Sequence, residues 1–437
     1  MNHRTNYAFE SLLIQAYKFP PVQAVSVERL SNLHRLFVEN AAACWVQTSS
    51  NKQYFPKDET LQSNVDHANL QVIRTKDLRT LRGQRGKNIA FLDKNEKKAL
   101  LYTFFRSLYH AYPFILFTGD GGYTYLRESY RSAVKLIEQE GITHLFSSFR
   151  PWADHLVAYR LKKRFPHLIW IADFRDLPVD PVRRDVWWPA LQTWWQKRLL
   201  KRANIVTTVS DGLARRLRSD HQQVIVVRNG LASLPNGFLT APASAHFTIT
   251  YTGSLYPGLQ SAEPLLQLLR ELINEGELNP AHLELHYAGK DGALWQEWTT
   301  RHTLGYLSTD HGMVSLARAR EMQSNSQLNL LLSWSAKDYG GIMTAKLGSY
   351  LSAGRPIITL LHGPPDPELT QVVEHTGAGF VYASEEPESP QQLRTFLLHA
   401  YRSWAFSGAL PWRIDPHKLQ PYTWENQMEH LLRTLDV

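Results

Sequence analysis

The chain has 437 residues, of which 43% are hydrophobic and 20% are charged. This composition is typical of a folded globular protein and excludes a disordered chain, and the length favours two domains over one. The single cysteine, Cys44, excludes an intramolecular disulfide and a cysteine-based metal cluster. The sequence shows neither a signal peptide nor an apolar run long enough to span a membrane. We therefore expect a cytoplasmic protein, soluble or peripheral at the inner face of the plasma membrane.

Charge is unevenly distributed along the sequence. Residues 1–240 carry 35 Lys and Arg against 20 Asp and Glu (+15), whereas residues 241–437 carry 13 against 20 (−7), giving the net charge of +8. A basic half joined to an acidic half indicates that the first half binds an anionic partner, such as nucleic acid, phosphorylated lipid or a membrane surface. A generally solvated basic face is the alternative.

Short apolar runs alternate with segments of helical spacing through the first half of the chain. The runs predict strands over 12–16, 43–47, 142–147, 168–172, 205–209 and 224–227. The spacing predicts helices over 25–38, 96–109, 123–140, 154–164, 189–202 and 211–217. Residues 51–100 are polar and predict long loops with one basic strip that includes Arg74 and Lys76. The alternation predicts an α/β fold with a doubly wound parallel sheet.

Residues 231–246 are rich in Pro, Ser, Ala and Gly, and we interpret them as an interdomain linker. A second alternating half follows, with strands predicted over 247–251, 283–288, 328–333 and 357–361 and helices over 262–274 and about 424–435. Between the last two strands, Leu347, Tyr350 and Leu351 fall on one face of a short helix. Gly354, followed by Arg355-Pro356, is a stop signal for that helix.

Polar and glycine residues follow the carboxyl ends of these strands, which is where open α/β sheets bind ligands. They are Asp173, Arg175, Asp176, Arg228, Asn229, Gly253, Ser254, Gly289, Lys290 and Lys337. This set suits a phosphorylated, hydroxyl-rich ligand. The loop after the strand over 328–333 also leads into the N-terminus of a helix, where free N–H groups and the helix dipole favour binding of a phosphate. An ordinary βαβ unit with a capped helix is the alternative.

Several common catalytic and nucleotide-binding motifs are absent from the sequence. It contains neither the P-loop pattern nor G-x-G-x-x-G after a strand. It also has no H-E-x-x-H, no Asp-x-Asp pair and no G-x-S-x-G nucleophile elbow. We therefore predict no metal site and no cofactor other than a co-substrate.

A set of short motifs occurs in order over nearly the whole chain: F-P-P, S-S-F-R-P-x-A-D-H, W-I-A-D-F-R-D, A-N-I-V-T-T-V-S, R-N-G, Y-T-G-S-L-Y and T-A-K-L-x-x-Y-L-x-A-G-R-P-I-I. Together they resemble GT-B-fold glycosyltransferases of the retaining family 4 (group 1) type. The resemblance implies two Rossmann-like domains facing across a cleft. It implies an acceptor domain over 1–240 and a nucleotide-sugar domain over 247–419, with a terminal helix over about 420–437 packing back on the first domain.

The resemblance also assigns roles to residues. It predicts a catalytic set of His155 near the transferred sugar and of Arg175 and Asp176 at the cleft rim, although His155 could instead cap its helix. We interpret Asp173 as half of a buried, structural Arg–Asp pair. The predicted donor-binding residues are Asn229, Gly253, Ser254, Lys290, Lys337, Thr344, Lys346 and Ser349. Among these, Gly253 would let the backbone approach a diphosphate closely, and Lys346 would face that diphosphate or lie in solvent.

The sequence departs from the family pattern at three positions. Ser349 and Gly341 replace the two spaced glutamates, one of which commonly grips the nucleotide ribose, and Leu259 replaces a frequent phosphate-binding lysine. Serine cannot make the charge-assisted, bidentate contact of a carboxylate. The protein either holds its nucleotide through Lys290, Lys337 or Lys346, or is a degenerate member.

The segment from Trp187 to Arg202 combines indoles with cations. Trp187, Trp188, Lys197 and Arg198 are predicted to lie on the acceptor or membrane side, because indoles beside cations suit a membrane–water interface or a lipid-linked acceptor. Aromatic residues packed in the domain, with the cations in solvent, are the alternative.

We therefore predict a retaining, metal-independent hexosyltransferase that uses a nucleotide diphosphate sugar and acts on a glycan or lipid-linked acceptor in cell-surface polysaccharide assembly. The alternatives are a nucleotide-sugar epimerase, which we expect to carry more carboxylates, and a catalytically silent binding or scaffold protein. A nucleic-acid partner is not predicted, because the basic residues form no recognised module.

Overall fold

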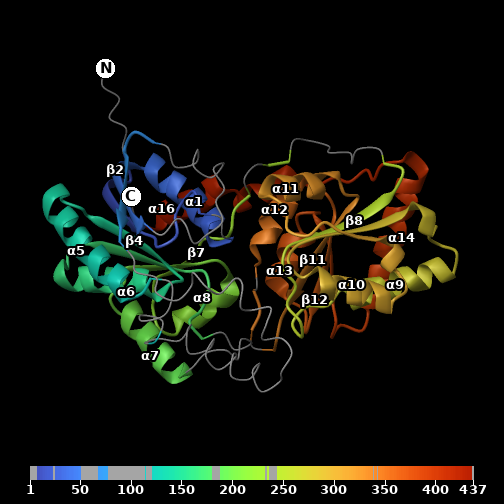
Figure 1. Ribbon diagram of the computed structural model, residues 1–437, viewed down its shortest axis with the longest axis horizontal. Helices are drawn as coiled ribbons and strands as arrows, with labels where there is room; N and C mark the ends of the chain where they lie inside the picture. The colour runs from blue at the N-terminus through green and yellow to red at the C-terminus, as the bar shows by residue number, and fades with distance from the viewer. Residues whose placement is uncertain are drawn as a thin grey trace. The chain divides into compact units, whose positions relative to one another are not determined.

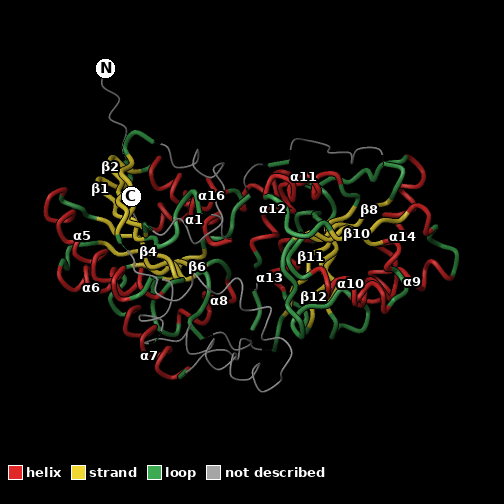
Figure 2. The backbone as a smooth tube through the Cα atoms, in the orientation of Figure 1, coloured by secondary structure: helices red, strands yellow, loops and turns green. Residues whose placement is uncertain are grey.

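The computed structural model describes residues 7–22, 25–50, 67–76, 114, 121–179, 188–231, 234–235, 244–337, 339–341 and 343–435. The chain divides into two compact units (Figures 1 and 2). Unit 1 comprises Met1–Val227 and Met428–Val437, and unit 2 comprises Arg228–Gln427. The chain thus leaves unit 1 after Val227 and returns to it at Met428, compared with the predicted boundaries near 240 and 420.

Unit 1 alternates strands and helices along the described part of the chain. Its elements are β1 (Phe9–Gln15), α1 (Val25–Glu39), β2 (Ala41–Ser49), β3 (Leu70–Thr75), α5 (Tyr123–Glu140), β4 (His144–Phe149), α6 (Trp152–Arg164), β5 (Ile169–Phe174), α7 (Pro189–Leu200), β6 (Ile205–Thr208), α8 (Asp211–Arg218) and β7 (Val224–Val226). The predicted helix over 96–109 lies outside the described residues.

The strands of unit 1 form one parallel sheet in the order β3-β2-β1-β4-β5-β6-β7. Its central strands are apolar because helices cover both faces of a doubly wound sheet. The predicted fold class is therefore confirmed. The prediction of loops throughout 51–100 is wrong for Leu70–Thr75, which form β3. Among the described strands it pairs with β2 alone, and most of its residues are exposed or half-buried, so it lacks the apolar run on which strand prediction relies.

Unit 2 repeats the alternation with a smaller sheet. Its elements are β8 (Phe247–Thr252), α9 (Glu263–Asn274), β9 (Leu283–Ala288), α10 (Gly292–Arg301), β10 (Ser308–Asp310), α11 (Leu316–Asn325), β11 (Leu328–Trp334), α12 (Ala345–Ala353), β12 (Ile357–His362), α13 (Pro367–Val373), β13 (Gly379–Ala383), α14 (Ser389–Ser407) and α15 (Pro416–Leu419). Short 3-10 turns lie at Pro280–His282, Gly305–Leu307 and Gln420–Tyr422, and α16 (Trp424–Thr434) spans the return to unit 1.

The sheet of unit 2 is parallel, in the order β10-β9-β8-β11-β12-β13. This order places the carboxyl ends of β9, β8 and β11 next to one another. The predicted helix stop is also confirmed, because Gly354 caps α12 in the left-handed conformation at φ 66°. The sequence did not predict α10, α11, α13, α14, β10 or β13.

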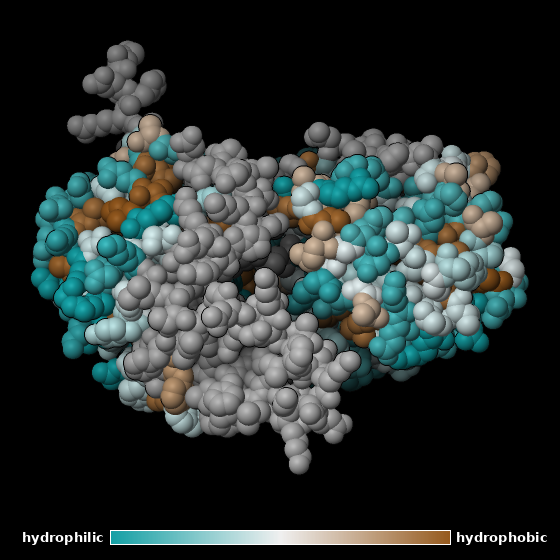
Figure 3. All heavy atoms as spheres, in the orientation of Figure 1, coloured by the Kyte–Doolittle hydropathy of each residue, from teal (hydrophilic) through white to brown (hydrophobic). Residues whose placement is uncertain are grey.

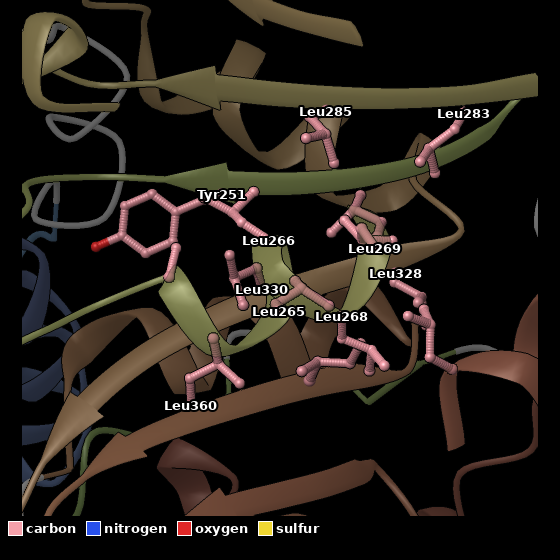
Figure 4. Close-up of a cluster of buried hydrophobic side chains, with 14 of the residues drawn as sticks. Tyr251, Leu265, Leu266, Leu268, Leu269, Leu283, Leu285, Leu328, Leu330 and Leu360 are labelled. Carbon is pink, nitrogen blue, oxygen red and sulfur yellow. The ribbon is translucent and has the colours of Figure 1, made fainter. Parts of the chain in front are cut away.

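The core of unit 2 is built largely of leucines from α9 and the central strands (Figure 4). Leu265 and Leu269 of α9 pack with Leu285, Leu328 and neighbouring side chains, and all of these are buried. Hydrophilic residues cover much of the unit 2 surface visible in Figure 3, with hydrophobic residues scattered among them. The core fixes β8, β9 and β11, and therefore the positions of their carboxyl ends.

Candidate functional site

The loops that follow β8 and β9 lie against each other in unit 2. The Gly253 amide donates a hydrogen bond to the Ala288 carbonyl at 2.7 Å. A Cβ atom added to Gly289 would lie 2.3 Å from the Gly253 carbonyl oxygen, so only glycine fits there. Gly253 itself has φ 124°, which disfavours any side chain. Two of the predicted strand-end glycines are thus brought together by tight backbone packing.

Lys346, in the first turn of α12, reaches across to the end of β8. Its ammonium donates hydrogen bonds to the Tyr251 hydroxyl and, at 3.3 Å, to the Ser254 carbonyl. The same nitrogen lies 4.1 Å from the centroid of the Tyr251 ring, a cation–π distance. A Cβ atom on Gly253 would lie 2.3 Å from the Lys346 Cε atom. The structure therefore places three predicted donor-binding residues, Gly253, Ser254 and Lys346, in one location.

The ammonium of Lys346 lies in a poorly solvated position. Burial lowers the pKa of Lys346 to about 7, and the carboxylate of Asp291 only partly offsets this effect. That carboxylate is already engaged, because its Oδ2 accepts a hydrogen bond from the Leu255 amide at 2.9 Å. An anion placed beside Lys346 would favour the charged form and raise its pKa again.

A cluster of three aromatic rings lies beside this lysine. The rings of Tyr251, Tyr287 and Trp295 are nearly parallel, with centroids 5.5 to 6.3 Å apart. Tyr251 lies at one end of the leucine core with its hydroxyl pointing away from the leucines (Figure 4). The Tyr287 hydroxyl donates to the Gly253 carbonyl at 3.1 Å and accepts from the Asp291 amide at 2.9 Å. This aromatic cluster thus holds the loops after β8 and β9 in place.

The N-terminus of α12 lies beside the same loops. Thr344 is its N-cap residue, but no side chain caps the helix and its first turn contains no acidic residue. The Thr344 Oγ1 atom is buried and has no hydrogen-bond partner among the described residues. Uncapped amides and a positive helix end favour an anion. This end of α12 therefore adds to the positive potential around Lys346.

The residues that replace the family glutamates have local structural roles. The Ser349 hydroxyl donates to the Lys346 carbonyl at 2.8 Å, within its own helix. The Gly341 amide donates to Oδ2 of the buried Asp366 at 2.5 Å. Asp366 also accepts from the Glu368 and Leu369 amides, so it links this loop to the start of α13. Neither position offers a carboxylate for a ribose.

The remaining predicted donor-binding residues differ in their exposure. Lys290 and Lys337 are exposed, and Asn229 is half-buried. A Cβ atom on Gly348 of α12 would lie 3.1 Å from the Gly230 carbonyl oxygen, so the segment containing Asn229 packs on α12. The sequence did not single out Tyr251, Tyr287, Asp291 or Asp366 as functional residues. Tyr251 stands within the Y-T-G-S-L-Y motif, and the other three carry no comparable signal.

In unit 1, the structure does not support a direct catalytic role for His155. Its side chain has no exposed surface, and its Nδ1 atom is hydrogen-bonded to the Ser147 hydroxyl at 2.8 Å. The ring also packs against Phe174, with centroids 4.5 Å apart. Burial lowers the pKa of His155 to about 3, so the imidazole stays neutral. The ring is thus buried and neutral in this structure, and its Nε2 atom has no hydrogen-bond partner among the described residues.

The interpretation of Asp173 as half of a buried ion pair is confirmed. Its Oδ1 lies 2.9 Å from Nη2 of Arg29, and both side chains are buried. The hydroxyls of Ser148 and Thr207 donate to the same carboxylate at 2.7 and 2.9 Å. Burial alone would raise the pKa of Asp173, but the Arg29 charge and these hydrogen bonds outweigh it and lower the pKa. The next residues along the chain, Arg175 and Asp176, are half-buried and exposed, respectively.

The helix α7 carries exposed indoles beside cations. Trp188 and Trp194 are 47% and 50% exposed, and the Arg198 guanidinium lies 5.4 Å from the centroid of the Trp194 ring. Lys197 is exposed and lies 3.4 Å from the Asp220 carboxylate. Trp187 lies outside the described residues. The indoles of Trp188 and Trp194 are thus not packed in the core.

Among the described residues, no group of three or more His, Cys, Asp or Glu side chains could hold a metal ion. In the same part of the chain, no helix is long and apolar enough to cross a membrane.

The sequence matches no protein-family model and no curated protein. Among solved structures, the chain is similar to sucrose-phosphate synthase from Thermosynechococcus elongatus, with a TM-score of 0.57 at 13% identity over 98% of this chain and 99% of that one. It is also similar to the lipopolysaccharide outer core galactosyltransferase WaaB (TM-score 0.57, 11% identity, 98% and 99% covered). A third similar structure is TarM (TM-score 0.58, 8% identity, 98% and 99% covered). At these identities the similarity shows the fold, which is the two-domain GT-B fold that the motifs predicted.

Proposed function

We propose that the protein is a glycosyltransferase that moves a hexose from a nucleotide diphosphate sugar to a glycan or lipid-linked acceptor. Transfer would proceed with retention of the anomeric configuration and without a metal ion. The observation that carries this proposal is the convergence of Lys346, Gly253 and the uncapped N-terminus of α12 at the carboxyl end of β8. The similarity of the fold to a galactosyltransferase and to sucrose-phosphate synthase supports the same reaction class.

The chemistry of this location suits a departing diphosphate. In such a transfer the enzyme positions the donor and stabilises negative charge that develops on the leaving group. The Lys346 ammonium, which a bound diphosphate would keep protonated, and the first-turn amides of α12 would supply positive charge without a metal ion. Gly253 would permit the diphosphate to approach the backbone closely, because it has no side chain. A Cβ atom at this position would also collide with Lys346.

Two alternative functions make different predictions. The exchange of carboxylates for Ser349 and Gly341 would be explained by a binding or scaffold protein that has lost catalysis. A nucleotide-sugar epimerase would use the same donor location without an acceptor. Stabilisation by no nucleotide sugar would favour the scaffold, and conversion of the nucleotide sugar to its epimer without an acceptor would indicate the epimerase.

We place the enzyme in cell-surface polysaccharide synthesis, at the cytoplasmic side of a membrane. The support for this placement is the exposed pair Trp188, which precedes α7, and Trp194, within α7, together with the exposed cations Arg198 and Lys201 at the end of the helix. Indoles and cations on one surface suit the headgroup region of an anionic bilayer.

Thermal-shift measurements with UDP-, GDP-, dTDP- and ADP-sugars test the donor proposal. We expect one nucleotide class to raise Tm in the wild-type protein, because a ligand that binds only the folded state stabilises it. Lys346→Met should abolish that shift, whereas the exposed control Lys135→Met should retain it. A panel in which no nucleotide sugar raises Tm would favour the scaffold instead.

A further inference from the structure

The hydroxyl of Tyr251 lies between the Lys346 ammonium and the backbone of the loop after β8. It donates a hydrogen bond to the Ser254 carbonyl at 2.7 Å, and its oxygen accepts a hydrogen bond from the Lys346 ammonium. A phenol has a single hydrogen to donate, and the Ser254 carbonyl takes it. The phenol oxygen therefore presents a lone pair to the ammonium, and this arrangement favours the charged form of Lys346.

Packing fixes the position of the Tyr251 ring. The residue has no exposed surface, and its ring is nearly parallel to the rings of Tyr287 and Trp295, at interplanar angles of 7° and 10°. Trp295 is itself anchored, because its Nε1 atom donates to the Ser308 hydroxyl at 2.8 Å. The Lys346 nitrogen lies 4.1 Å from the centroid of the Tyr251 ring, so the ring attracts the cation as well. A fixed ring and a directed lone pair together restrict where the ammonium can lie.

The position that Tyr251 favours for the ammonium is beside the Cα atom of Gly253. A Cβ atom built on Gly253 would lie 2.3 Å from the Cε atom and 2.7 Å from the Nζ atom of Lys346. The end of the lysine side chain thus lies against the one face of this loop that carries no side chain. An anion that approaches the Gly253 backbone from this face meets the ammonium.

Three phenols at this location are kept neutral by their surroundings. Burial raises the pKa of Tyr251 well above its usual value, raises that of Tyr287 to about 12, and also raises that of Tyr350. Burial lowers the pKa of Lys346 to about 7, against the opposite effect of Asp291. The titratable groups that act on Tyr251 are Tyr256, Tyr287, Tyr350 and Asp291. A pH dependence of donor binding that is absent without Lys346 therefore reports on the ammonium.

We propose that Tyr251 is a positioning residue for the donor diphosphate, because its hydroxyl and ring hold the Lys346 ammonium beside Gly253. The identity of the anion rests on the proposed transferase function, whereas the coupling of Tyr251 to Lys346 is a property of unit 2 alone. Tyr251 itself does not contact the donor in this proposal. Loss of its hydroxyl should therefore affect donor binding only through Lys346.

The coupling can be measured without any donor by nuclear magnetic resonance of the full-length protein labelled with carbon-13 lysine. The Lys346 signal is the one that Lys346→Arg lacks, and in the wild-type protein it should titrate with a pKa near 7. Tyr251→Phe keeps the ring and removes the acceptor, so it should lower this pKa by about half a unit or more. The control Tyr287→Phe removes a hydroxyl that bonds Gly253 and Asp291 instead, and should leave the pKa within about 0.2 unit. An unchanged pKa in Tyr251→Phe would overturn the proposal.

Calorimetry with the nucleotide sugar that raises Tm then tests the effect on the donor. Tyr251→Phe should weaken binding about tenfold at pH 8 and less at pH 6, where more of the lysine is protonated. In the Lys346→Gln background the same substitution should change the affinity by less than about twofold. An equal loss in both backgrounds would show that Tyr251 acts through the loop, and would overturn its role in positioning Lys346. Because the resonance measurement includes no nucleotide sugar, failure of this inference is distinguishable from failure of the proposed transferase function.

Discussion

Lys346 combines a buried ammonium with a position beside a glycine loop. Burial lowers its pKa to about 7, well below the ordinary value for lysine, so its charge is less stable near neutral pH than that of an exposed lysine. Burial of a cation without a full counter-charge is unfavourable, and positions of this kind gather at functional sites. The anion that would relieve this cost is the diphosphate of the proposed donor.

The affinity for a nucleotide diphosphate sugar should therefore depend on the protonation of Lys346. A bound diphosphate raises the pKa of the ammonium above about 7, so binding takes up a proton when the pH exceeds that value. The contribution of Lys346 to affinity is complete below pH 7 and falls as the pH rises through the pKa of the bound state. Calorimetry between pH 6 and 9, with the nucleotide sugar that raises Tm, should show this decline. Lys346→Gln should bind weakly with a flat profile, and an equally steep profile in that variant would refute the assignment.

The buried pair of Arg29 and Asp173 should contribute to stability rather than to chemistry. Removal of one partner leaves an uncompensated buried charge, which typically costs about 3–5 kcal/mol. We expect Arg29→Met to lower the free energy of unfolding by an amount in that range. The control Arg131→Met breaks an exposed pair with Glu128 and should cost less than about 1 kcal/mol. Urea denaturation of both variants measures the difference, and similar losses would contradict the structural role.

At the scale of elements, α7 and the residues that flank it in the chain carry no acidic side chain of their own. No Asp or Glu occurs from Trp188 to Ser210, while Arg198, Lys201 and the indole of Trp194 are exposed. Each cation near an anionic bilayer contributes about 1 kcal/mol at low salt. Replacing Arg198 and Lys201 by Gln should weaken binding to phosphatidylglycerol vesicles about 30-fold.

Vesicle co-sedimentation at several salt concentrations measures this effect. The charge-matched control is the double substitution of Arg131 and Lys135 by Gln on the exposed side of α5. It should leave binding nearly unchanged, because this helix exposes no tryptophan. Binding that is independent of anionic lipid, or lost equally in both variants, would argue against a membrane role of α7.

The elements that sequence could predict are those whose signal is local. The strands β8, β11 and β12 are short runs of buried residues, and such runs were recognised directly. The edge strands β3 and β10 are largely exposed and lack such runs, so their pairing comes from the neighbouring strand. Gly253 and Ser254 were predictable because they follow the carboxyl end of a strand, whereas Lys346 was assigned through the resemblance of its motif to the family. The burial of His155 and the aromatic cluster beside Lys346 depend on packing between distant segments, which no local pattern encodes.

At the scale of the whole molecule, each unit contributes a sheet with charged groups at its carboxyl edge. Unit 2 offers Lys346 and the N-terminus of α12. The proposed division of labour assigns the nucleotide sugar to unit 2 and the acceptor to unit 1. Substitution at Lys346 should then raise the KM for the donor.

The most direct test of the central claim is nuclear magnetic resonance of the product formed from an α-linked nucleotide sugar. The donor is the one that raises Tm, and the acceptors offered are glycans and lipid-linked sugars. We predict a new glycosidic bond in the α configuration, formed by the wild-type protein and at least about a hundredfold more slowly by Lys346→Met, since loss of one transition-state donor typically costs about 10²–10³ in rate. A β-linked product would contradict retention. Absence of any product with a bound donor would contradict the transferase itself.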